Sequence, residues 1–146
     1  MYPIDAYTLK LERFDDEARI PPYAILSHTW GESEVTFEHI RKLNELDGLG
    51  AWNIRKTCEQ ALKENLCYAW VDTCCVDKKS SAELSEAINS TFRWYRQSFV
   101  CYAFLQDVTH GGEDIFEDLT GARRSTRGWT LQELFAPPHM ALYDQR

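Results

Sequence analysis

The sequence lacks an excess of basic residues, a long apolar run and a signal-peptide pattern at its start. Its 16 lysines and arginines are outnumbered by 23 aspartates and glutamates, which gives a net charge of −7. A nucleic acid or an anionic membrane is bound through a basic face, so we expect neither as a direct partner. No apolar run approaches the roughly 20 residues of a membrane span. The sequence therefore predicts a cytoplasmic protein.

Paired cysteines and clustered histidines are also absent. The five cysteines include no C-x-x-C pair and the four histidines are scattered, so neither a disulfide framework nor a metal site is indicated. Cys67 and Cys101 lie in apolar runs and are predicted to be core residues. Cys74 and Cys75 lie where a predicted strand gives way to a loop, and a thiol there could be reactive. By residue type alone, one of them could be a nucleophile paired with His28.

The length and composition indicate one globular domain. A chain of 146 residues is long enough to bury a core without disulfides or metals, and we see no internal repeat and no low-complexity segment. Residues 1–22 are polar and broken by prolines, so they are predicted to be a lead-in segment with a candidate strand at residues 7–11. The chain ends directly after a predicted strand, so we expect the natural protein to continue beyond residue 146.

Apolar runs alternate with helical patterns along the chain. The runs predicted to be strands span residues 23–28, 67–72, 99–105 and 139–143. Helical spacing predicts one helix over residues 36–43, a second from residue 51, and a third that opens with the capping box Ser80-x-x-Glu83. The predicted inner face of the third helix consists of Leu84, Ala87, Ile88, Thr91, Phe92 and Tyr95. This alternation predicts an α/β fold with three layers, in which helices flank a mostly parallel sheet.

Polar residues follow the first two predicted strands. Ligands of such sheets bind beyond the carboxyl ends of the strands, where the chain carries Ser27, His28, Trp30 and Gly31 after the first strand and Asp72 after the second. Trp30 could stack on a ring or belong to the core. His28 could equally be a hydrogen-bonded structural histidine, and Asp72 could orient a site or cap the following loop.

A second candidate site lies near the end of the chain. A short helix is predicted between Gly128 and Pro137. Trp129 and Glu133 are four residues apart, so on a helix their side chains share one face. An indole beside a carboxylate offers a flat surface for a ring and a negative charge for a developing cation. Alternatively, Trp129 is a core residue and Thr130-x-x-Glu133 is a capping box.

Three blocks of the sequence resemble the HET domain, the heterokaryon incompatibility domain of filamentous fungi. They are residues 23–31 (YAILSHTWG), residues 69–77 (AWVDTCCVD) with the following 86–89 (EAIN), and residues 127–134 (RGWTLQEL). Asp77-Lys78-Lys79 departs from the Asn-Gln-Asp-type turn that is common in the family. The resemblance implies an effector of programmed cell death that acts in fungal innate immunity, in the response to non-self fusion partners.

A more distant resemblance is to the TIR domain, which has a flavodoxin-like fold. Residues 25–32 are similar to its first strand and loop, and Trp129-x-x-x-Glu133-Leu134 is similar to the motif whose glutamate is catalytic in NAD-cleaving members. This likeness implies that NAD is a substrate and that no cofactor is needed. Glu133 would stabilise the oxocarbenium-like state formed when the nicotinamide–ribose bond breaks.

The same likeness assigns roles to the other candidate residues. Ser27 and His28 are placed to meet the ribose or the phosphates, Arg127 could pair with the diphosphate or with Glu133, and Trp129 could form a wall of the pocket. The further members of the implied binding site are Trp30, Gly31 and Asp72.

The sequence is compatible with two classes of function. The first is an NAD nucleosidase (NAD glycohydrolase) that is active when assembled. The second is a non-enzymatic, self-associating adaptor module for non-self recognition. Both predict self-association on activation, with other incompatibility or NLR-type proteins as further partners, and they differ in whether Glu133 is needed.

Overall fold

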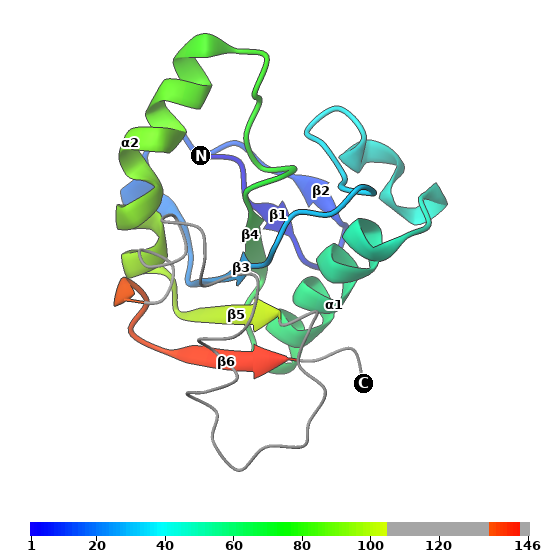
Figure 1. The fold of residues 1–146 in the computed structure, drawn as a ribbon. Helices are drawn as coiled ribbons and strands as arrows, with labels where there is room; N and C mark the ends of the chain where they lie inside the picture. Colours follow the sequence, from blue (N-terminus) through cyan, green and yellow to red (C-terminus); the bar gives the residue numbers. More distant parts are fainter. Residues whose placement is uncertain (105–134, 144–146) are drawn as a thin grey trace.

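The computed structural model describes residues 1–104 and 135–143, and Figure 1 shows how their elements are arranged. The described strands form a six-stranded sheet in the order β2-β1-β4-β3-β5-β6. These strands are β1 (Ile4–Asp5), β2 (Lys10–Leu11), β3 (Tyr23–Ser27), β4 (Tyr68–Val71), β5 (Val100–Phe104) and β6 (Met140–Tyr143). The pairs β3–β4, β3–β5 and β5–β6 are parallel, whereas β1 is antiparallel to both β2 and β4. The predicted α/β fold with a mostly parallel sheet is therefore confirmed.

Helices flank this sheet (Figure 1). α1 (Leu49–Lys63) packs against β3 and β4. α2 (Ser81–Gln97) lies on the other side, where the Tyr23 hydroxyl donates a hydrogen bond to the carbonyl of Trp94 and the rings of Trp70 and Trp94 pack with their centroids 5.4 Å apart. The described chain also has two 3-10 helices, η1 (Glu17–Arg19) and η2 (Ile40–Glu45). Within residues 1–104 and 135–143, no helix has the length and apolarity needed to cross a membrane.

Residues 1–22 do more than lead into the sheet. Ile4 of β1 is fully buried and pairs with Ala69 of β4. The carboxylate of Glu17 accepts hydrogen bonds from Arg93 and from the indole N–H of Trp94, at 2.9 and 2.8 Å. The segment thus extends the sheet at one edge and is also tied to α2.

The candidate strand at residues 7–11 is shorter than expected. Leu9 has a φ of 58°, which lies outside the extended region, so β2 begins only at Lys10. The helix predicted over residues 36–43 is wrong in type and in its start, because the chain forms the 3-10 helix η2, which begins only at Ile40. The helix predicted from residue 51 already begins at Leu49.

The predicted inner face of α2 is wrong in part. Ala87 and Tyr95 are buried as expected, but Ile88 and Phe92 are 53% and 45% exposed. Trp94, which was not on the predicted face, is buried instead, because its ring packs on Trp70. The helical period fixes the spacing of a stripe, but it does not select between two neighbouring stripes when several aromatic residues are adjacent.

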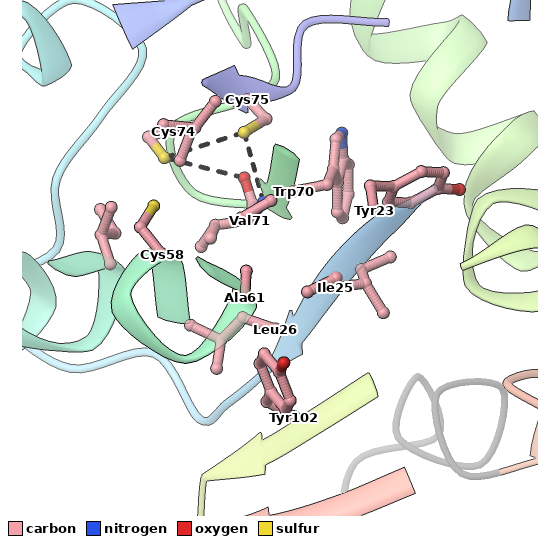
Figure 2. Close-up of a cluster of buried hydrophobic side chains, with 14 of the residues drawn as sticks. Tyr23, Ile25, Leu26, Cys58, Ala61, Trp70, Val71, Cys74, Cys75 and Tyr102 are labelled. Carbon is pink, nitrogen blue, oxygen red and sulfur yellow. Dashed lines mark hydrogen bonds between the residues drawn. The ribbon is translucent and has the colours of Figure 1, made fainter. Parts of the chain in front are cut away.

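The core lies on both sides of the central strands, and Figure 2 shows part of it. Cys101 is fully buried as predicted, whereas the prediction for Cys67 is wrong, because β4 begins one residue later and leaves Cys67 exposed. Leu26 and Tyr102 lie on the side of α1 together with Ala61, as Figure 2 shows.

Candidate functional site at the carboxyl edge of the sheet

The two central parallel strands end at the same edge of the sheet. Leu26 of β3 pairs with Val71 of β4, so Ser27 and Asp72 follow at neighbouring positions of the two strands. Ser27 is buried, and His28 directly after it is 8% exposed. Sequence and register therefore bring these predicted site residues to one place.

A hydrogen bond joins the loops that follow β3 and β4. The indole Nε1–H of Trp30 donates to Oδ2 of Asp72 at 2.8 Å, while the Trp30 side chain remains about half exposed. The other oxygen of this carboxylate, Oδ1, is shielded from solvent and has no hydrogen-bond partner in the described part of the chain. Burial raises the pKa of Asp72, although His28, the Trp30 N–H and Lys78 act in the opposite direction.

Lys78 is a member of this site that the sequence reasoning missed. Its ammonium nitrogen lies 3.7 Å from the centroid of the Trp30 ring, within the range of a cation–π contact. Burial lowers the pKa of Lys78, while the charges of Asp72, Cys74 and Glu34 oppose that effect. The only sequence signal was that Lys78 belongs to the turn that departs from the family pattern. Because the ammonium covers one face of the indole, stacking on Trp30 would use the opposite face.

His28 is held by a carboxylate from the same loop. Its Nε2 lies 3.1 Å from Oε2 of Glu34, and Oε1 of Glu34 accepts a hydrogen bond from the Gly31 N–H at 2.8 Å. Burial alone would raise the pKa of Glu34, but the hydrogen bond and charge of His28, together with the Gly31 N–H, lower it. The contact fits the structural alternative for His28 and fixes the position of its ring.

The start of α1 supports the loop that carries Glu34. A Cβ added to Gly50 would lie 2.3 Å from the carbonyl oxygen of Ser33 and 2.9 Å from Cα of Glu34. Only glycine allows the helix to approach this loop so closely. A side chain at residue 50 would push the loop, and Glu34 with it, away from His28.

The buried thiols do not fit the alternative of a cysteine nucleophile. Cys74 and Cys75 are both buried, their sulfur atoms are 4.0 Å apart, and Sγ of Cys75 accepts the Val71 N–H (Figure 2). Burial raises the pKa of Cys74 most, and the contact with Cys75 raises it further. A buried thiol that stays protonated is neither a good nucleophile nor a metal ligand.

Three predicted site residues, Arg127, Trp129 and Glu133, lie outside the described residues, so their roles stay predictions. Among residues 1–104 and 135–143, no group of three or more His, Cys, Asp or Glu side chains could hold a metal ion. The described part of the site thus contains the hydrogen-bonded pairs Trp30–Asp72 and His28–Glu34, with Lys78 over the Trp30 ring.

Comparisons with known proteins agree with this picture. A family model described as heterokaryon incompatibility protein (HET) matches residues 23–125. The vegetative incompatibility protein HET-E-1 of Podospora anserina is 44% identical over 135 residues, which cover 87% of this chain and 10% of that protein. The chain thus spans about a tenth of the length of this curated relative. No solved structure matches the chain, so the likeness to flavodoxin-like TIR domains stays a prediction.

Proposed function

This chain belongs to the heterokaryon incompatibility (HET) family, and on that basis we propose that it is an effector domain of fungal incompatibility and regulated cell death that cleaves NAD. The reaction is the breaking of the nicotinamide–ribose bond by the self-associated domain. The substrate binds at the carboxyl edge of β3 and β4.

The observation that carries this proposal is the state of Asp72. Its Oδ2 is held by Trp30, whereas its shielded Oδ1 has no partner among the described residues. A buried oxygen of this kind lacks a hydrogen bond that a ligand can supply. A ribose hydroxyl is such a donor, and the carboxyl edge of parallel strands is where nucleotides bind in open α/β sheets.

Neighbouring residues suit the other parts of the substrate. Lys78 places a cation beside the site, where it can pair with the diphosphate. Among the described residues, a Cβ added at Gly31 would meet only Oε1 of Glu34, at 3.8 Å, so this side of the backbone leaves room for a ligand. Ser27 and His28 lie at the end of β3 on the same edge.

The chemistry rests on Glu133, and Arg127 and Trp129 keep the binding roles that the TIR likeness implies for them. As the C1′–N bond breaks, its electron pair goes to the nicotinamide nitrogen, which leaves as a neutral ring and needs no acid. The carboxylate of Glu133 stabilises the positive charge that develops on the ribose. Water then adds at C1′ and releases a proton, which gives ADP-ribose.

The test is nicotinamide release by the purified domain at high concentration with a crowding agent. We expect release by the parent protein, none by Glu133→Gln and less by Asp72→Asn. The matched control is Glu32→Gln, which removes an exposed carboxylate from the loop after β3 that also carries Trp30. This variant should release nicotinamide like the parent.

A non-enzymatic adaptor is the second candidate function. Ile88 and Phe92 favour it, because these two apolar side chains share the exposed side of α2 and suit contact with another copy. Sedimentation of the parent protein and of an Ile88→Glu variant measures that contact. If the parent self-associates but releases no nicotinamide, the adaptor is the correct function.

A further inference from the structure

A cavity of about 400 Å³ lies between α1 and the β5–β6 half of the sheet. Its walls come from Leu26 of β3, from Trp52 and Asn53 of α1, and from Tyr102 and Phe104 of β5, with Tyr143 of β6 beyond them. The volume falls in the range of roughly 300–1,000 Å³ that is common for small-molecule sites. Neither Trp30 nor Asp72 lines this cavity, so it is separate from the candidate site at the carboxyl edge.

The side chain of Asn53 is the unexplained feature of this cavity. Asn53 is 3% exposed and lines the cavity from the second turn of α1. Neither its amide nitrogen nor its amide oxygen has a hydrogen-bond partner within the described residues. A buried amide that makes no hydrogen bond costs stability. Both amide atoms are shielded from solvent, so a ligand in the cavity reaches them only when the Asn53 side chain turns toward it. The amide then offers a donor and an acceptor side by side, which match a ligand edge with the reverse order.

The remaining walls are mostly aromatic, with Thr57 and Gln60 of α1 as further polar members. The rings of Trp52 and Phe104 pack with their centroids 5.5 Å apart, and those of Tyr102 and Tyr143 with 5.2 Å. These distances leave no room for a further ring between the members of either pair, so a planar ligand would lie against them. Burial and the nearby Glu64 raise the pKa of Tyr102, so its hydroxyl stays protonated.

Two lysines of α1 border the cavity at its exposed side. Lys56 and Lys63 each make a salt bridge to Glu59, at 3.1 and 3.2 Å, and all three side chains are more than half exposed. One carboxylate faces two ammonium groups here, while Glu64, whose charge acts on Tyr102, adds a second negative charge near the cavity. A phosphate outside the cavity can take the place of Glu59 at either lysine.

We propose that this cavity binds a nucleotide through its base, with Asn53 pairing with the base and the phosphate lying toward Lys56 and Lys63. Adenine has the required edge, because its amino group donates to the Asn53 oxygen and its neighbouring ring nitrogen accepts from the Asn53 amide. The inference goes beyond the proposed function and does not depend on it, because binding here requires no bond to break.

The test is isothermal titration calorimetry of the whole 146-residue chain with AMP, adenosine and ribose 5-phosphate. AMP contains no nicotinamide bond, so the result is independent of NAD cleavage. We expect saturable binding of AMP, weaker binding of adenosine and none of ribose 5-phosphate. Asn53→Leu keeps the size of the side chain and should weaken AMP by about tenfold to a hundredfold, as expected for loss of a bidentate pair.

Two further variants separate the contributions. Asn89→Leu makes the same change on the exposed side of α2 and should bind AMP like the parent. Lys56→Gln combined with Lys63→Gln should reduce the affinity for AMP to that for adenosine and leave adenosine unchanged. Thermal unfolding without ligand should show that Asn53→Leu is folded, with a melting temperature no lower than that of the parent, because a buried unpaired amide has been removed.

Two results would overturn the proposal. One is a folded parent protein that binds neither AMP nor adenosine at millimolar concentration, which would mean that only water satisfies Asn53. The other is AMP binding that Asn53→Leu leaves unchanged, which would place the nucleotide elsewhere on the chain.

Discussion

Replacing Asp72 by asparagine should stabilise the folded protein at neutral pH. The carboxylate has one shielded oxygen without a partner in the described chain. In asparagine an amide NH2 group takes the place of this oxygen; it is also unpaired, but it carries no charge, so the gain is the part of the burial cost that is due to the charge. The carbonyl of asparagine can still accept the Trp30 N–H, so that hydrogen bond is kept. The variant loses the attraction of Lys78, which offsets part of the gain. We expect a net gain on the order of 1 kcal/mol, or roughly 3 °C in melting temperature for a chain of this size.

The sign of the pH dependence follows from the raised pKa of Asp72. Between the ordinary pKa of about 3.9 and the raised value, the folded state holds a proton that the unfolded chain has released. The Asp72 contribution to stability therefore falls as the pH rises through this window, and the full cost is present above the raised pKa. Below about pH 4 both states are protonated, so parent and variant should have nearly equal stability.

Urea unfolding followed by tryptophan fluorescence at pH 4 and pH 7 measures the effect. Asp47→Asn changes an exposed carboxylate and should shift stability by less than about 0.5 kcal/mol. Trp30→Phe removes the donor to Asp72 and should be destabilising at pH 7. The reasoning is refuted if Asp72→Asn is less stable than the parent at pH 7, or if its advantage persists unchanged at pH 4. Loss of nicotinamide release together with a gain in stability would identify Asp72 as a functional rather than a structural residue.

Two further predictions concern the loop after β3 and the cysteines. Gly50→Ala should destabilise the protein by about 1–3 kcal/mol, because its Cβ would lie 2.3 Å from the Ser33 carbonyl oxygen, and this overpacking outweighs the gain of up to ~1 kcal/mol in helix propensity. Gly31→Ala is the control in thermal unfolding, because within the described chain its Cβ would meet only one atom, at 3.8 Å. A higher melting temperature for Gly50→Ala would show that α1 does not support the loop. Brief treatment of the native protein with iodoacetamide should modify Cys67, which is exposed, but neither Cys58, whose pKa burial raises to about 12, nor Cys74. Rapid modification of Cys74 in mass spectra of the native protein would contradict its assignment to the core.

The sequence by itself determined the order of the described strands and helices from β3 onward and the meeting of Ser27, His28 and Asp72 at the carboxyl edge. Apolar runs gave β3 to β6, and Ser80 does cap α2 by accepting the Glu83 N–H. These features depend on residues that are close in sequence, so local patterns carry them. The carboxyl edge followed as well, because parallel strands separated by helices must end on the same side of their sheet.

Only the tertiary structure decided which distant residues meet. Helical periodicity could not show that Trp94 lies on the side of α2 that faces the protein core, because its partners Trp70 and Glu17 belong to other parts of the chain. In the same way, no pattern indicated that Ile4 would extend the sheet beside β4, or that Lys78 would cover Trp30. The orphaned amide of Asn53 is a further case, since a polar residue inside a helix shows its lack of partners only when the facing strands are in place. Local sequence sets the spacing of side chains along an element, whereas the rotation and pairing of elements are set by packing between segments that are far apart in the chain.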